Sequence, residues 1–242
     1  MPIIKSHQLD LNNISLTDVK TNDNGGKSIY VNYQKSLFKM QTPVMTMPYA
    51  LSCFDKGDTP KYSIDVAFRD MDTDHRVKGF HENMKSLEQH ILNQGLENSK
   101  AWFQKKIKSL DVLNALFTPI VKQSIDKATG EPDGRYADTI KLKFPFWNGK
   151  FKVEVSDFED NVIENPDMDA IFTKETKIQA IVRCGGVWVV GGKFGCTWSV
   201  EKIRVESKES SGGGNGMSFI NDESDSGSDS DGGEVEDSSD EE

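Results

Sequence analysis

The stretch KLKFPFWNGKFKVEV, residues 141–155, decides more about the fold than any other part of the chain. Asn148-Gly149 is the preferred residue pair for a two-residue type I′ turn, because both turn positions need a positive φ. Such a turn fixes the register of a β-hairpin, so Trp147 is expected to pair with Lys150. The sequence therefore predicts an antiparallel hairpin with two defined faces.

Side chains alternate between the two faces of a strand, so the composition of each face follows from the register. One face is apolar and is expected to lie against the core: Leu142, Phe144, Phe146, Phe151, Val153 and Val155. The other face carries four lysines and a tryptophan: Lys141, Lys143, Trp147, Lys150 and Lys152. Ammonium groups pair with phosphates and an indole stacks on a base, so this face is typical of a single-stranded nucleic-acid site. An amphipathic hairpin whose lysines are merely solvated explains the same pattern.

A second β-rich stretch covers residues 178–205, IQAIVRCGGVWVVGGKFGCTWSVEKIRV. Gly185-Gly186 predicts a two-residue turn, which would place Arg183 opposite Trp188 as a cation–π pair. The later GGKFG segment predicts a glycine-flanked tip that lets a nucleic-acid backbone approach and displays Lys193 and Phe194. A tight connection with Phe194 in the core is the alternative, and Trp198 is expected in the core.

The rest of the chain places a helical segment between groups of strands. Strands are expected at 28–33, 36–41, 49–54 and 62–68, and again from Thr139 onward. An apolar spacing of three and four residues predicts a helix that begins near Asp74, and a second helical stretch is expected at 99–117. This order does not suit a parallel α/β sheet. It predicts a mainly β (α+β) fold, an OB-fold-like antiparallel barrel with a helical insert at about 74–117.

The C-terminal segment differs sharply in charge from the rest of the chain. Residues 209–242 hold twelve carboxylates and no Lys or Arg, whereas residues 1–208 hold 29 basic and 27 acidic side chains. We expect one domain at 1–208 and a disordered Gly/Ser/acidic tail at 209–242. Such a tail can occupy a cationic groove or recruit a partner, and a plain solubility tail is the alternative. The expected partner-binding residues are Phe219, Asp222, Glu223, Asp237, Asp240, Glu241 and Glu242.

The sequence lacks the motifs that several kinds of catalytic or cofactor-binding site require. The glycines around Lys193 lack the spacing of a phosphate-binding P-loop, and no dinucleotide-binding fingerprint follows a strand. The four His and three Cys have no zinc-ligand spacing, and no serine-nucleophile motif occurs. We therefore expect no catalytic residue, no metal and no cofactor. There is no apolar run of membrane-spanning length and no secretory signal, and the three Cys suit a reducing, intracellular compartment with Cys184 and Cys196 as buried thiols.

The two β-rich stretches, followed by a Gly/Ser hinge and an acidic tail, resemble the single-stranded DNA-binding proteins of large nucleocytoplasmic DNA viruses. Those proteins are similar to the OB-fold replication proteins of podophages. The resemblance implies a protein that coats single strands during DNA replication, recombination and repair, in the host cytoplasm or nucleus. It also implies that the tail covers the DNA groove and contacts the DNA polymerase and other replisome proteins. The phage relatives end in an aromatic residue, whereas this chain ends in Glu241-Glu242 and its only tail aromatic is Phe219.

The sequence thus predicts a non-enzymatic, sequence-tolerant single-stranded DNA-binding protein. The residues expected to contact DNA are Lys141, Lys143, Trp147, Lys150, Lys152, Arg183, Trp188, Lys193 and Phe194. An acidic-tailed protein of the histone-chaperone kind and an RNA-binding OB or cold-shock-like protein stay open as alternatives. A nucleic-acid-processing enzyme has the least support. A homodimer also stays open, and no membrane partner is expected.

Overall fold

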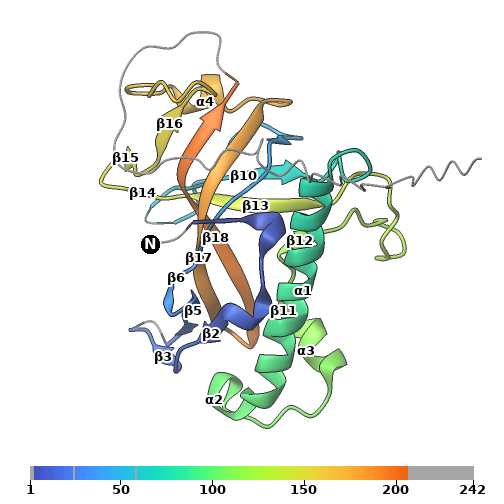
Figure 1. Cartoon of the computed structure of the whole chain (residues 1–242). Helices are drawn as coiled ribbons and strands as arrows, with labels where there is room; N and C mark the ends of the chain where they lie inside the picture. Colours follow the sequence, from blue (N-terminus) through green and yellow to red (C-terminus); the bar gives the residue numbers. More distant parts are fainter. Residues whose placement is uncertain (1–2, 24, 58, 207–242) are drawn as a thin grey trace, which may run out of the picture.

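The computed structural model describes residues 3–23, 25–57 and 59–206, so the predicted acidic tail lies outside the described residues (Figure 1). The helices are η1 (Ser6–Gln8) and η2 (Leu11–Asn13), both 3₁₀, and α1 (His75–Glu97), α2 (Ser99–Phe103), α3 (Leu110–Leu116) and α4 (Met168–Ile171). The strands before α1 are β1 (Ile4–Lys5), β2 (Ile14–Leu16), β3 (Lys20–Thr21), β4 (Lys27–Ile29), β5 (Val31–Tyr33), β6 (Ser36–Leu37), β7 (Lys39–Gln41), β8 (Met45–Thr46), β9 (Ser52–Phe54) and β10 (Lys61–Ala67). Those after α3 are β11 (Phe117–Thr118), β12 (Val121–Lys122), β13 (Thr139–Phe144), β14 (Phe146–Trp147), β15 (Lys150–Phe151), β16 (Glu154–Ser156), β17 (Lys177–Val190) and β18 (Lys193–Val205).

Five strands pair in a series that returns to its start: β8, β10, β13, β18, β17 and again β8. The closure is thin, because β8 contributes one residue pair with β10 and two with β17. The series is not all antiparallel either, since β13 and β18 run parallel with Leu142 beside Trp198. The chain is therefore mainly β with a few helices, and its mixed sheet is not a clean barrel. This corrects the expected antiparallel OB-like barrel.

The long helix α1 follows β10 and packs along the sheet (Figure 1). It begins where the sequence predicts, because the Asp74 carboxylate accepts a hydrogen bond of 2.8 Å from the Arg76 backbone N–H. Its buried side includes Val77, Phe80, Met84, Leu87 and Ile91, which confirms the predicted apolar face. Helices α1, α2 and α3 lie between β10 and β13, the second and third strands of the five-strand series, whereas the helix of an OB-fold lies between its third and fourth strands.

The helical stretch expected at 99–117 is divided into two short helices. Helix α2 ends at Phe103, and Gln104 takes a left-handed conformation with φ 59°. The chain then turns back, so that the Ile107 N–H donates to the Ser99 hydroxyl at 3.2 Å. A new helix, α3, begins at the Ser109 cap. Serine hydroxyls thus give the backbone an alternative to helical hydrogen bonds in the lysine-rich stretch between them.

The first hairpin has the predicted register, with Phe146 opposite Phe151 and Trp147 opposite Lys150. It forms a separate two-stranded sheet, because Pro145 separates β14 from β13. The predicted inner face is buried at Leu142, Phe144 and Val155 and half-buried at Phe146, Phe151 and Val153. The ring of Tyr62 covers the hairpin, with its centroid 4.9 Å from that of Phe146 and 4.7 Å from that of Phe151.

The second hairpin turns at Gly191-Gly192, where both φ values are positive, and not at Gly185-Gly186. The earlier glycines instead form an irregularity inside the continuous strand β17. Gly186 has φ 84°, and a Cβ there would lie 2.5 Å from the Ile29 carbonyl oxygen of β4. Glycine is therefore required at this position by the close approach of a neighbouring strand, which local sequence does not reveal.

The core lies between the sheet and α1. Trp198 is buried there as predicted, with only 1% of its surface exposed. Cys184 and Cys196 are free, buried thiols with their sulfur atoms 3.4 Å apart, which confirms the expectation for these two residues. Of the residues described, none belongs to a helix long and apolar enough to cross a membrane.

Candidate nucleic-acid interface

A split in the sheet creates the candidate site. Strand β11 runs parallel to β18 at Phe194 and Gly195, and β13 runs parallel to it further along, at Trp198 and Ser199. Between these two contacts, at Cys196 and Thr197, β18 has neither strand beside it. A pocket of about 200 Å³ lies in this split and is lined by parts of β11, β12, β13, β17 and β18.

The pocket gathers lysines and an indole from three strands. Lys141 and Lys143 come from β13, Lys122 from β12 and Trp188 from β17. Three of the residues predicted to contact DNA, Lys141, Lys143 and Trp188, thus meet at one place although they lie up to 47 positions apart in the sequence. The arrangement offers ammonium groups for phosphates beside the flat face of an aromatic ring.

The positive charges in the pocket are only partly compensated. Lys141 donates to the Asp65 carboxylate at 3.1 Å and to the Ser63 hydroxyl at 3.4 Å. Lys143, in contrast, has no carboxylate within ion-pairing distance in the described part of the chain. Lys143 as a whole is exposed, but partial desolvation of its ammonium, together with the like charges of Lys61 and Lys141, lowers its pKa below the ordinary value. A bound phosphate would relieve this repulsion, which is the electrostatic signature expected of an anion site.

Trp188 owes its position to a glycine on the neighbouring strand. It pairs with Gly195, and a Cβ on Gly195 would lie 3.0 Å from Cζ2 of Trp188 and 3.1 Å from Cβ of Thr118. The indole therefore lies over the main chain of β18 and reaches toward β11. Because Trp188 is only half-buried, part of its ring stays open to the pocket.

Three residues that the sequence did not single out belong to the same outer face. Lys143 pairs with Ser63, so Lys61, two positions before Ser63, points to the same side as Lys143. Phe54 pairs with Lys61 and is 54% exposed. The third is Lys122, an exposed residue that pairs with Thr139 at the start of β13. The alternation in Lys61–Ser63–Asp65 could have indicated an outward polar face, but nothing local shows that β10 lies beside β13.

Trp147, Lys150 and Lys152 lie on the β14–β15 hairpin, which continues the chain from the end of β13 away from α1 (Figure 1). All three are exposed, and Trp147 has 51% of its surface accessible. The Lys152 ammonium lies 5.8 Å from the centroid of the Trp147 ring. The hairpin can therefore present an aromatic ring with a cation beside it, outside the pocket that contains Lys143.

The remaining predicted residues divide into two on the outer face and one in the core. Arg183 pairs with Ser199 on the outer side, and its guanidinium lies 3.2 Å from the Glu201 carboxylate, so it does not form the predicted cation–π pair with Trp188. Lys193 is exposed beside the Gly191-Gly192 turn. Phe194 is fully buried, with ring centroids of Phe103 and Phe117 at 5.1 and 5.0 Å. The prediction that Phe194 is displayed is wrong, because the helical insert covers it.

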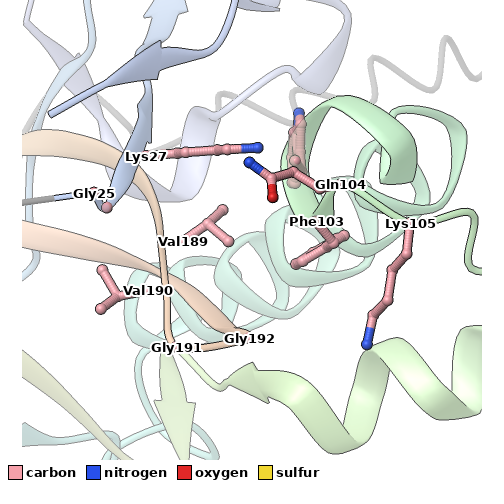
Figure 2. A pocket seen from close by; sticks show the side chains of 11 residues that line it. Gly25, Lys27, Phe103, Gln104, Lys105, Val189, Val190, Gly191 and Gly192 are labelled. Atoms are coloured by element: carbon pink, nitrogen blue, oxygen red, sulfur yellow. The ribbon is translucent and has the colours of Figure 1, made fainter.

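A second pocket, of about 350 Å³, lies at the tip of the β17–β18 hairpin against α2 (Figure 2). Its wall includes Val189, which points to the opposite face of β17 from Trp188. In Figure 2, Lys27 and Gln104 point toward each other, whereas Lys105 points away. The Lys27 ammonium already donates to the Ala101 carbonyl at 2.5 Å. This pocket therefore brings none of the predicted DNA-contacting side chains together.

Comparison with solved structures finds similarity to the single-stranded DNA-binding protein from bacteriophage Enc34. Its complex with ssDNA is 11% identical, with a TM-score of 0.42 over 82% of this chain and 96% of that chain. A C-terminal truncation of it is 16% identical, with a TM-score of 0.44 over 81% and 98% of the two chains. A further structure of the same protein is 16% identical, with a TM-score of 0.41 over 87% and 99%. No family model matches this chain, and no curated protein does. Similarity at this level does not assign a function, so the function proposed below rests on the residues of the split in the sheet.

Proposed function

We propose that this chain is a sequence-tolerant, non-enzymatic single-stranded DNA-binding protein. The observation that carries the proposal is the pocket in the split sheet, where Lys141, Lys143, Lys122 and Trp188 converge. Among the described residues, no carboxylate forms an ion pair with Lys143. Phosphates would pair with the lysines while a base stacks on the indole. Stacking requires bases that are not already stacked in a duplex, so the arrangement favours single strands.

The contact residues we propose follow the outer face of the sheet and its extension. Lys61, Lys122, Lys141 and Lys143 would pair with phosphates along β10, β12 and β13. Trp188 would stack within the pocket and Trp147 on the hairpin beyond β13. Lys150, Lys152, Lys193 and Arg183 would add charge at the margins, with Arg183 weakened by its ion pair to Glu201.

Titration of fluorescently labelled oligo-dT with the full-length chain tests this function. We expect anisotropy to rise, tryptophan fluorescence to be quenched, and duplex DNA of equal length to bind more weakly. The logarithm of the binding constant should fall with the logarithm of salt concentration by about 0.7 for each phosphate contact. Absence of quenching, or a binding constant that salt does not change, would refute the proposal. A matched RNA oligomer that binds more tightly than DNA would reassign the protein to RNA.

We further propose that the acidic residues of 209–242 compete with DNA for the pocket in the split of the sheet and the lysines around it, which together form the proposed DNA groove. They carry twelve carboxylates, and no carboxylate of residues 3–206 that the structure describes forms an ion pair with Lys143. Tethering gives the segment an effective concentration of roughly millimolar, so a weak intrinsic affinity is enough for competition. Partner proteins such as a DNA polymerase and other replisome members would capture residues from Phe219 to Glu242 and expose the groove. This would place the protein at sites of viral DNA replication, recombination and repair, as the sequence resemblance implies.

Deletion of residues 209–242 tests the competition. The truncated chain should bind oligo-dT more tightly than the full-length chain, and the difference should shrink at high salt because screening weakens both interactions. Equal or weaker binding by the truncated chain would contradict competition while leaving the DNA-binding function itself intact.

A further inference from the structure

A third pocket lies beside the split in the sheet and has a volume of about 700 Å³. Two tyrosines line it, Tyr49 from the segment between β8 and β9 and Tyr136 from the segment between β12 and β13. Their side chains are among the most exposed large apolar groups that the structure describes, at 62% for Tyr49 and 68% for Tyr136. Two exposed rings that line one pocket can stack on the flat face of a base.

The same pocket contains cations suited to phosphate. Lys122, Lys127 and Arg135 line it. Two carboxylates also line it, but both are engaged by the loop itself. Asp126 accepts from the Ala128 N–H at 2.6 Å, and Asp133 accepts from the Ser124 hydroxyl at 2.5 Å.

The hydrogen bond from Ser124 also lowers the pKa of Asp133 below its ordinary value. Arg135 approaches Asp133 only loosely, at 3.9 Å. The carboxylates therefore shape the loop, and the positive groups are left for a ligand.

This pocket (the tyrosine pocket) adjoins the pocket in the split of the sheet (the lysine pocket). Lys122 lines both of them. Along the outer face of β13, Thr139 lines the tyrosine pocket, and Lys141 and Lys143 line the lysine pocket. Alternate residues of a strand are about 7 Å apart, so the distance from Thr139 to Lys143 is roughly 13 Å. One strand of nucleic acid could therefore pass from one pocket into the other.

We propose that Tyr49 and Tyr136 form a base-stacking subsite that extends the DNA track beyond the lysine pocket, with Lys122 and Arg135 on the adjoining phosphates. The inference rests on the single-stranded DNA-binding function proposed above. It assigns this subsite to one end of the track, so only oligomers long enough to fill both pockets reach the tyrosines.

The test compares full-length wild type, Tyr136→Ala and Tyr49→Ala across oligo-dT lengths of about 4 to 16 nucleotides, the range of site sizes for one OB-type domain. Each alanine variant should bind the longest oligomers about five- to 150-fold more weakly than wild type, the loss of one stacked base. Each should bind the shortest oligomers, which the lysine pocket holds, about as well as wild type. Tyr136→Phe should bind like wild type, because stacking needs the ring and not the hydroxyl.

Tyr30→Ala is the matched control, since Tyr30 is also exposed, at 47%, but lines neither pocket. Its affinity should be unchanged, and the melting temperatures of all variants should match. A photoreactive bromodeoxyuridine at either end of a long oligomer supplies a second readout, with cross-links to Tyr49 or Tyr136 from one end only.

If wild type binds but both alanine variants bind every length equally well, the subsite does not exist, and the proposed function stands. Equal losses at all lengths would overturn its place at the end of the track. If wild type binds no oligomer, the proposed function fails and the subsite with it.

Discussion

The two β-hairpins differ in what determines their geometry. The β14–β15 hairpin follows its turn residues, since Asn148-Gly149 alone yields the observed pairing of Trp147 with Lys150. The β17–β18 hairpin does not follow its first Gly-Gly pair, because β4 packs against Gly186 and holds β17 extended past it. Turn chemistry thus decides the short hairpin, whereas a tertiary neighbour decides the long one. The same contrast extends to function, because only the long hairpin takes part in a pocket that contains lysines from other strands.

The largest expected effect concerns stability. Gly186→Ala should destabilise the fold by about 2–5 kcal/mol, because alanine would be strained at φ 84° and its Cβ would clash with the Ile29 carbonyl. Gly149→Ala should cost only about 1–2 kcal/mol, since its turn has positive φ but open space around it. Urea unfolding curves of the two variants measure the difference. Equal losses would remove the distinction between the hairpins.

The next effect concerns charge. Lys143→Glu should weaken binding of oligo-dT by about 1.5–3 kcal/mol, the worth of a hydrogen bond to a charged group. Lys150→Glu makes the same charge change at a lysine that is also exposed but lies outside the pocket, and it should cost less than about 1 kcal/mol. Fluorescence anisotropy at one fixed salt concentration compares the two. A larger loss of affinity for Lys150→Glu than for Lys143→Glu would show that the main phosphate contacts lie on the β14–β15 hairpin.

The two tryptophans give a third comparison. Trp188→Ala and Trp147→Ala should each weaken binding by about 1–3 kcal/mol, the contribution of one stacked base. We expect Trp147→Ala at the lower end, because the Lys152 ammonium already lies over that ring. Titrations of each variant give the losses, with thermal melting as the control because Trp188 also packs over Gly195. A negligible loss of affinity for Trp147→Ala would show that bound DNA does not extend from the sheet onto the β14–β15 hairpin.

The smallest effect is a pH dependence from Lys143. Its pKa is lowered in the free protein by burial and by Lys61 and Lys141, and a bound phosphate favours the charged form. DNA binding should therefore take up a proton, and affinity should fall as pH rises through the lowered pKa toward the ordinary lysine value of about 10.4. Lys143→Arg keeps its charge throughout and should bind with a shallower pH dependence over this window. Identical profiles for Lys143→Arg and wild type would show that Lys143 does not contact phosphate.

Local signals in the sequence predicted the elements that depend on neighbouring residues. The Asp74 cap, the apolar side of α1 and the register at Asn148-Gly149 all agree with the structure, because each depends on hydrogen bonds or spacing within a few positions. The buried position of Trp198 was also predicted. The mainly β character with a helical insert followed from the same patterns.

What the sequence could not predict depends on contacts between distant segments. Phe194 was expected at an exposed tip, but α2 and β11, distant in the chain, cover it. Lys61 and Phe54 were not singled out, because their place beside Lys143 requires the pairing of β10 with β13. Arg135 and Tyr136 lie in the loop between β12 and β13, and no local pattern indicates a role for them. Their role could be proposed only once that loop was seen beside Tyr49.

The parallel contact between β13 and β18 also has a consequence for biosynthesis. Lys143 and Ser199 are neighbours in the sheet but lie 56 positions apart in the sequence. Domains generally fold as units during synthesis, and the N-terminal residues leave the ribosome first. A nascent chain whose β18 has not yet left the ribosome therefore lacks one wall of the lysine pocket. Under the proposed function, the protein should be able to bind DNA only at the end of its own synthesis. Unfinished copies would then not occupy the single-stranded DNA.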